Sequence, residues 1–460
     1  MTLNPTFLKL IKAPALLAII SFVLYWVMAY DLERTNTLKL LSIYTTVFLL
    51  FYLLIQYTKH NLKLLTWLAF GFRAIFILAI PNLSQDFYRF IWDGRMILEG
   101  FNPYLYTPES FITSNQFPVA QAQELYNGMG ELNGSHFTNY PPLNQLCFAI
   151  AALFASKSIL YSATVMRLII IAADFGTLYF GKKLLKKLNL SEHNIFWYIL
   201  NPFIIIELTG NLHFEGVMIF FLIWSLYLLH SGKWKWAAVI LACSISVKLI
   251  PLMFLPLFYQ WFVKNDSSLK SGIVRLLSFY SIVGGSILIL FLPFFDTQFI
   301  SNYSKTVGLW FNNFEFNASI YYLAREIGYL FRGYNEIAVI GKILPVIVIL
   351  YILIVTFFRK NKSTRQLISA MLFTISIYLF FSTTVHPWYI AMPLVLAVFT
   401  NYKFPILWSL AVVLSYLAYT NKDNTENLWV IAIEYCIVYA YFIYEVRFKK
   451  SGLATNQLQG

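Results

Sequence analysis

The stretch "EIAVIGKILPVIVILYILIVTFF", residues 336–358, decides the structural class of this protein. A helix that crosses a membrane needs about 20 predominantly apolar residues, and this stretch supplies them. A cluster of basic residues, Arg359, Lys360, Lys362 and Arg365, follows directly. Lys and Arg gather on the cytoplasmic side of membrane spans. The stretch therefore predicts a transmembrane helix that ends at the cytoplasmic face.

The composition of the whole chain agrees with this prediction. Of 460 residues, 59% are hydrophobic and 12% are charged, and the mean hydropathy is +0.65. These values exclude an ordinary soluble domain. The net charge of +13 comes from short basic clusters between apolar runs, which indicates topology rather than a nucleic-acid partner. Cys147, Cys243 and Cys436 are too far apart to suggest a metal site or a disulfide framework, and we expect no cofactor and no metal.

The apolar runs and basic clusters predict an all-α polytopic membrane protein with about 13–14 transmembrane helices, including short half-spans, and with both termini in the cytoplasm. The predicted spans are 13–30, 38–57, 63–81, 162–181, 195–210, 214–230, 272–294, 336–358, 366–384, 388–400, 404–420 and 428–446. The run 143–156 is too short to cross and predicts a re-entrant or interfacial helix. The run 237–263 contains "VKLIP" and predicts two half-spans that meet near Lys248 and Pro251.

Two long external loops follow from this topology, 82–161 and 295–335. Ionisable residues from several parts of the chain are then placed on the same outer side, and we expect them to line one cavity: Asp86, Asp93, His136, His213, Glu215, Lys248 and His386. A transporter would place such groups nearer the midplane, commonly in two repeated halves, and no convincing repeat is visible. An enzyme at the outer face is therefore favoured, with a lipid-linked-saccharide flippase or transporter as the alternative.

The segment "PNLSQDFYRFIWDGR", residues 81–95, opens the first external loop. A helix that begins after Ser84 would place Asp86, Arg89 and Asp93 on one face and would suit the membrane interface. Asp86 can be read as a first-turn acid favoured by the helix dipole or as a functional carboxylate. Asp93 has a structural explanation, because Arg89 lies one helical turn away and can form an ion pair with it.

A series of motifs along the chain resembles one known group of enzymes. The motifs are, in order, "SQDFYRFIWDGR", "EGFNPYLYTP", "NYPPLNQL", "NPFIIIELTGNLHFEG", "SVKLIPLMFLPL" and "VHPWYI". Together they resemble the GT-C superfamily of integral-membrane glycosyltransferases, and most closely the bacterial mannosyltransferases that use a polyprenyl-phosphate sugar as donor. The resemblance covers residues 63–460 and leaves residues 1–62 as two additional N-terminal spans.

This resemblance implies roles for particular residues. Asp86 matches the acid that acts as general base, and a second acidic position falls where this chain has His213 and Glu215 instead of an aspartate pair. For the donor phosphate we predict Lys248 and His386, although snorkelling of Lys248 to the interface and capping of a span by His386 are alternatives. Further candidates for the phosphate are Arg89 and Arg95. Candidates for the substrate cavity are Asp93, His213, Glu215, Trp310, Asn313 and Asn317.

The predicted reaction is transfer of a hexose, above all mannose, from a polyprenyl-phosphate donor to a hydroxyl of a lipid-linked or cell-envelope glycan. A lipid phosphate is already a good leaving group, so one base and a few cations suffice, and direct attack predicts inversion. We expect the protein in a bacterial inner membrane, in contact with membrane lipid and with its site facing the periplasm. The enzyme alternative is an O-antigen ligase or polymerase, which would depend on loop arginines and a histidine instead of Asp86.

Overall fold

The computed structural model describes residues 5–266, 268–312, 314–420 and 425–448, and every regular element within them is a helix. The first elements are α1 (Pro5–Tyr30), α2 (Thr37–Thr58), α3 (Leu62–Ile75), α4 (Asp86–Leu98), α5 (Pro108–Thr113), α6 (Ala122–Gly134), α7 (Pro142–Ala155), α8 (Ile159–Lys187), η1 (Glu192–Ile195), α9 (Phe196–Ile199), η2 (Ile204–Gly210) and α10 (Glu215–His230). The next are α11 (Trp234–Val247), η3 (Ile250–Leu257), α12 (Phe258–Val263), α13 (Leu269–Phe291), η4 (Leu292–Phe294), α14 (Phe299–Asn312), α15 (Ile320–Arg332) and α16 (Ile337–Phe358). The last are α17 (Thr364–Phe381), η5 (Pro387–Ile390), α18 (Ala391–Ala397), α19 (Phe404–Ala411), η6 (Val412–Thr420) and α20 (Leu428–Phe448).

Seven helices of the described chain are long and apolar enough to cross a membrane, or eight when a bent pair counts as one span. They include α1, α2, α8, α13, α16, α17 and α20. The opening stretch forms α16, with a mean hydropathy of 2.8 over its most apolar part. The predicted class, an all-α polytopic membrane protein, is confirmed. The remaining predicted crossings fall on helices that are shorter or bent, such as α10, α11 and α18.

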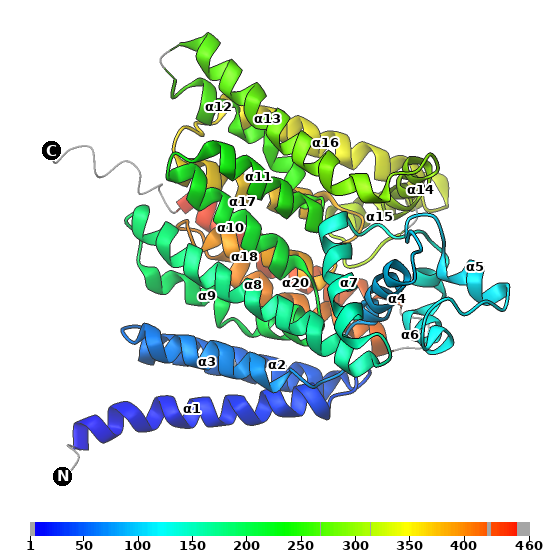
Figure 1. The fold of residues 1–460 in the computed structure, drawn as a ribbon. Coiled ribbons are helices and arrows are strands. Elements are labelled where there is room, and N and C mark those ends of the chain that lie inside the picture. Colours follow the sequence, from blue (N-terminus) through cyan, green and yellow to red (C-terminus); the bar gives the residue numbers. More distant parts are fainter. Residues whose placement is uncertain (1–4, 267, 313, 421–424, 449–460) are drawn as a thin grey trace.

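The helices form a bundle in which the two predicted external loops lie at the same end (Figure 1). Helices α4–α7 of the first loop and α14–α15 of the second meet there, while α1–α3 pack along one side of the bundle. Side-chain hydrogen bonds join the two loops, from Asn302 to the Tyr104 carbonyl at 3.2 Å and from the Tyr303 hydroxyl to the Asn139 carbonyl at 3.2 Å. The loops are therefore one packed unit.

Two predicted spans are wrong in their extent. The run 63–81 forms a helix only as far as Ile75, because donors from other helices bind the carbonyls that would continue it. The Ile77 carbonyl accepts Arg167 Nη1 at 2.9 Å, and the Ile75 carbonyl accepts the Tyr30 hydroxyl at 2.8 Å. Such bonds satisfy orphan carbonyls at a helix end.

The predicted span 195–210 is also broken. Pro202 interrupts the helical hydrogen bonds, and the Asn201 side chain accepts the Phe203 N–H at 3.0 Å, so the chain restarts as the π-helical η2. Helix α10 then leaves η2 at a bend of 111°. The short connection between the predicted spans 195–210 and 214–230 is therefore a sharp buried turn that carries His213 and leads into Glu215.

The predicted break in 237–263 is confirmed. Helix α11 ends at Val247, Lys248 has an extended backbone with φ −146° and ψ 138°, and η3 begins at Ile250. The proline Pro251 in the first turn of η3 suits a helix start, since its missing N–H needs no partner there. Helix α7 is a 14-residue apolar helix, as expected for a run too short to span.

Candidate active site

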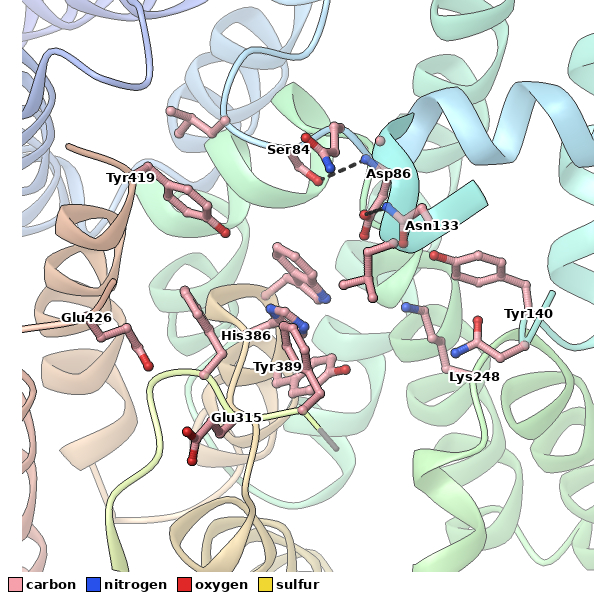
Figure 2. Close-up of a pocket in the computed structure, with 18 of the residues that line it drawn as sticks. Ser84, Asp86, Asn133, Tyr140, Lys248, Glu315, His386, Tyr389, Tyr419 and Glu426 are labelled. Atoms are coloured by element: carbon pink, nitrogen blue, oxygen red, sulfur yellow. Dashed lines mark hydrogen bonds between the residues drawn. The ribbon is translucent and has the colours of Figure 1, made fainter. Parts of the chain in front are cut away.

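A cavity of about 970 Å³ lies at the end of the bundle where the two external loops meet. This is at the upper end of the usual range for ligand pockets, about 300–1,000 Å³. Polar side chains from distant parts of the sequence line it, among them Arg34, Asp86, Asn133, Lys248, His386 and Glu426. In Figure 2, Asp86 and Lys248 lie on one side, Glu426 on the other, and His386 between them.

Asp86 is the first residue of α4 and is partly exposed to the cavity. Its Oδ1 accepts a hydrogen bond from Asn133 Nδ2 at 3.3 Å, and its backbone N–H is bound by the Ser84 hydroxyl at 3.3 Å (Figure 2). Burial raises the pKa of the Asp86 carboxyl, and nearby Lys248 partly offsets this. A carboxylate with a raised pKa that faces a cavity is suited to accept a proton.

Lys248 contributes an ammonium group to the cavity wall from the break between α11 and η3. Its Nζ lies 3.0 Å from Glu215 Oε1 and 5.3 Å from the centroid of the Tyr140 ring. Glu215 is only 1% exposed, so it is buried behind the lysine. The ion pair holds the lysine side chain at the cavity wall, and snorkelling away from the protein does not describe it.

His386 lies in a stack of rings at the middle of the cavity. Its ring is 4.6 Å from the Trp388 ring at an interplanar angle of 6°, and 5.3 Å from the Phe316 ring at an angle of 29°. Burial, reinforced by the charge of Lys248, lowers the pKa of His386 to about 3. His386 is therefore a neutral imidazole near pH 7 rather than the cation that we expected, and it can offer one N–H to a ligand.

His213 extends the same stack from behind. Its ring is 3.6 Å from the Trp388 ring, and Nε2 is 4.0 Å from Glu207 Oε2. His213 is 1% exposed and is not among the described residues that line the cavity. Of the two residues predicted to form a second site, His213 thus supports Trp388, and Glu215 supports Lys248.

The other charged residues of α4 are held by protein contacts. Arg89 Nε is 2.8 Å from Asp93 Oδ1, which confirms the predicted ion pair, and Asp93 also accepts a hydrogen bond from Gln145 at 3.1 Å. Arg89 further donates to the His136 carbonyl, and Arg95 donates to the Gln121 side chain. These guanidinium groups and Asp93 are buried and are not among the described residues that line the cavity.

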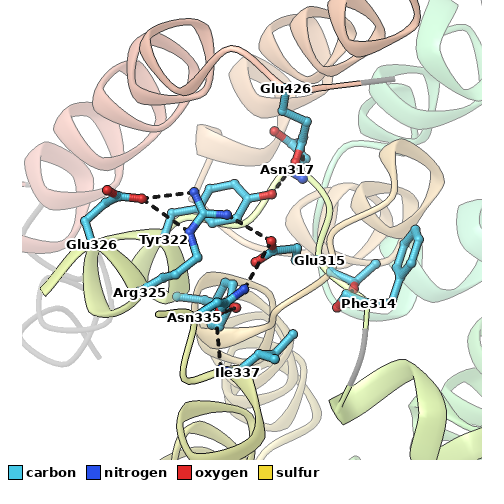
Figure 3. Close-up of polar contacts among 11 residues, drawn as sticks. Phe314, Glu315, Asn317, Tyr322, Arg325, Glu326, Asn335, Ile337 and Glu426 are labelled. Atoms are coloured by element: carbon cyan, nitrogen blue, oxygen red, sulfur yellow. Dashed lines mark hydrogen bonds and ion pairs between the residues drawn. The ribbon is translucent and has the colours of Figure 1, made fainter. Parts of the chain in front are cut away.

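A second polar cluster surrounds Arg325 (Figure 3). Its members Glu315 and Glu426 lie on the side of the cavity away from Asp86 (Figure 2). Arg325 Nη1 lies 2.9 Å from Glu315 Oε1, and the guanidinium group is 4.4 Å from the centroid of the Tyr322 ring. Glu426 accepts the Asn317 backbone N–H at 2.7 Å and a hydrogen bond from the Tyr322 hydroxyl. Burial raises the pKa of Glu426.

The second-loop candidates for the substrate cavity are not among the described residues that line it. Asn317 is buried, and its side chain bonds to Glu434 at 3.3 Å, so it is a neighbour of the cavity wall rather than part of the described lining. Trp310 belongs to α14, but its side chain lies outside the described part of the structure, as does the whole of Asn313.

Sequence reasoning missed several lining residues. Arg34, in the turn between α1 and α2, faces the cavity with its guanidinium group 4.0 Å from the centroid of the Tyr419 ring. The two N-terminal helices were expected to form an additional unit, yet their connecting turn contributes to the site. Glu315 and Arg325 were missed too, although an arginine and an acid in an aromatic loop predicted to face outward were a visible signal. Glu426, between η6 and α20, carried no such signal.

Two comparisons with known proteins are informative. A family model described as "Alpha-(1->6)-mannopyranosyltransferase, N-terminal domain" matches residues 10–264 of this chain. A curated protein from Mycobacterium tuberculosis (strain ATCC 25618 / H37Rv), named "Alpha-(1->6)-mannopyranosyltransferase A", is 20% identical over 377 residues, which cover 75% of this chain and 70% of the relative. The family match begins within α1 and includes Arg34, Asp86, Glu215 and Lys248.

Proposed function

Since this chain belongs to the alpha-(1→6)-mannopyranosyltransferase family and is an integral-membrane, mannose-transferring glycosyltransferase, we propose that it uses a polyprenyl-phosphate mannose donor. The acceptor is a hydroxyl of a lipid-linked or cell-envelope glycan, and the cavity opens to the periplasmic side. The topology derived from the basic clusters supports this orientation.

The observation that carries the proposal is the setting of Asp86. Its carboxylate faces a large cavity, receives one side-chain hydrogen bond from Asn133, and forms no ion pair with any described residue within 4.0 Å. The position at the start of α4 favours the ionised form through the helix dipole, while burial opposes it. Asp86 is thus an available base, and we assign it to the acceptor hydroxyl.

The proposed step is a direct displacement at the anomeric carbon of the donor. The acceptor oxygen attacks the anomeric carbon of the donor on the side opposite the phosphate, and a new glycosidic C–O bond forms. The bond between that carbon and the phosphate oxygen breaks, and the polyprenyl phosphate leaves with the electron pair. The acceptor proton passes to Asp86. Direct displacement of this kind inverts the configuration at the anomeric carbon.

Lys248 and His386 are proposed to bind the donor phosphate. Lys248 supplies an ammonium group whose position is fixed by Glu215, and His386 donates a hydrogen bond as a neutral imidazole. Leu249 and Ile250 line the cavity next to Lys248 and give the wall an apolar part that suits a polyprenyl chain. Arg89 and Arg95 are left out of this proposal, because protein carbonyls and side chains already bind them.

The test is a transfer assay with purified protein in detergent and an α-(1→6)-linked mannose oligosaccharide as acceptor. The donors are polyprenyl-phosphate mannose and a nucleotide-diphosphate mannose, each supplied alone. We expect a product that is one mannose longer with the lipid donor and none with the nucleotide donor. Transfer from the nucleotide donor alone would contradict the proposed donor.

A further inference from the structure

We propose that Glu315, Arg325 and Glu426 form a subsite for the glycan acceptor, a neutral chain of sugar hydroxyls. All three line the same cavity as Asp86. Glu315 and Glu426 lie across it from Asp86 and Lys248 (Figure 2). This inference rests on the proposed function, because it divides the cavity between two substrates. The donor phosphate lies at Lys248, and the acceptor extends from Asp86 toward the opposite wall.

The polar groups of this wall are held in fixed positions (Figure 3). Glu426 is bound by the Asn317 N–H at 2.7 Å and by the Tyr322 hydroxyl, and Glu315 is bound by Arg325 at 2.9 Å. A recognition group whose geometry is set before the ligand arrives loses little conformational entropy on binding. The arrangement therefore has the preorganisation of a binding wall.

The charge of the wall selects the kind of ligand. The lining carboxylates Glu315 and Glu426 flank the guanidinium group of Arg325, which is 2.9 Å from Glu315 and is also paired, outside the lining, with Glu326 at 3.0 Å. These carboxylates offset the charge of Arg325, so this wall offers an anionic phosphate no net positive charge. A carboxylate has several lone-pair sites, and those left over can accept hydrogen bonds from sugar hydroxyls. The acceptor suits this wall better than the lipid phosphate does.

Aromatic rings complete the same part of the cavity. Phe316, Tyr322 and Tyr419 are among its lining residues, and Arg325 covers one face of Tyr322. A mixture of aromatic surface and a few fixed polar groups is typical of pockets that orient a small molecule. The volume of about 970 Å³ leaves room for acceptor sugars beyond the one that reacts.

The backbone connects this wall to the donor side. The Phe316 N–H donates to the Thr383 carbonyl at 3.1 Å, and the Val385 N–H donates to the Phe316 carbonyl at 2.8 Å. These bonds join the segment that carries Glu315 to the segment that carries His386. The spacing between acceptor subsite and donor phosphate is thus fixed by main-chain contacts, which suits a reaction that needs two substrates aligned.

The experiment measures binding of an α-(1→6)-linked mannotriose to the full-length protein in detergent. We expect Glu315→Gln and Glu426→Gln each to weaken binding about tenfold or more, because each removes a charged hydrogen-bond acceptor. The matched control is Glu326→Gln, since Glu326 also pairs with Arg325 but is half exposed and is not among the described lining residues; its affinity should stay within about twofold of wild type.

Failure of the wild type to bind mannotriose, or unchanged affinity in Glu315→Gln, would overturn the subsite. Thermal unfolding is measured alongside, and if Glu426→Gln loses its fold, the result for Glu315→Gln decides. Binding of polyprenyl-phosphate mannose is the separate arm, and both variants should bind it like wild type. Weaker donor binding in Glu315→Gln would overturn the division of the cavity, whereas mannotriose binding without any lipid-donor binding in wild type would contradict the proposed function alone.

Discussion

Helix α4 carries the same chemical group at two positions, one at its start and one near its middle, in opposite settings. Asp86, in the first turn, faces a cavity and is bound by one amide, whereas Asp93, two turns later, is 1% exposed and is bound by Arg89 and Gln145. The two aspartates share one helical face, so sequence spacing alone does not account for the difference between their settings. Asp86 differs from Asp93 in its access to the cavity and in the absence of a direct countercharge, and both differences come from the packing around the helix.

The largest expected effect is on the transfer rate, from substitution of Asp86 at the cavity. Asp86→Asn keeps the size of the side chain but cannot accept a proton, so transfer should fall by about 10²- to 10⁴-fold. Binding of polyprenyl-phosphate mannose should persist, since the donor phosphate is assigned to Lys248 and His386. Initial transfer rates and donor affinity, measured on the same preparation, check both parts.

Substitution of the buried Asp93 should lower the stability of the protein rather than the rate of the chemical step. Asp93→Asn leaves the buried Arg89 without its carboxylate, and breaking a buried pair costs about 3–5 kcal/mol of unfolding free energy. The control is Glu192→Gln, which removes a half-exposed pair with Lys182 at 3.7 Å and should cost about 1 kcal/mol or less. Unfolding in detergent measures the stability of both variants. Equal stability of Asp93→Asn and Glu192→Gln would contradict the structural role of Asp93.

Variants of Lys248 test whether this cation both stabilises the buried Glu215 and binds the donor phosphate. Lys248→Met strands the buried Glu215 and should lower the unfolding temperature, whereas the double variant Lys248→Met with Glu215→Gln should recover most of it. The double variant should still bind the lipid donor about tenfold or more weakly, because a charge-assisted contact to the phosphate is lost. Donor affinity like wild type in the double variant would refute the phosphate assignment.

The smallest expected effect is a displacement of the pH profile. Burial raises the pKa of Asp86, and the base must be ionised to act, so the rate should fall with falling pH through a pKa above about 3.9, the ordinary value for Asp. Lys248 lowers that pKa, and its removal should move the acid limb to higher pH. Because Glu215 itself raises the pKa of Asp86, the dependence of kcat/KM on pH is compared between Glu215→Gln and the double variant, which differ only at residue 248. A limb that moves to lower pH would contradict the proximity of the two groups.

Local sequence information was sufficient for much of the fold and for part of the site. The apolar length of α16, the interruption before Pro251 and the pairing of Arg89 with Asp93 are properties of a few neighbouring residues, and each was predicted. Family membership also favours the predicted glycosyltransferase and not the alternative, a flippase. The resemblance that pointed to Asp86 rested on motifs that are likewise local.

The remaining features depend on contacts between distant segments. Helix α3 stops early because Arg167 of α8 binds its following turn, and no pattern within 63–81 contains that information. The wall of Glu315 and Glu426 forms from segments more than 100 residues apart in the chain. The resemblance, which covered residues 63–460, likewise left Arg34 outside the site, because neither motifs nor apolar spans show where the turn between α1 and α2 packs.

The most direct test of the account is the single-turnover transfer rate of wild type, Asp86→Asn and Asp93→Asn, each corrected for the fraction of folded protein. With the lipid donor already bound, this rate reports the chemical step rather than binding or stability. We predict that Asp86→Asn is slower by about 10²-fold or more, while folded Asp93→Asn stays within about tenfold of wild type. A wild-type rate in Asp86→Asn would contradict its assignment as the base.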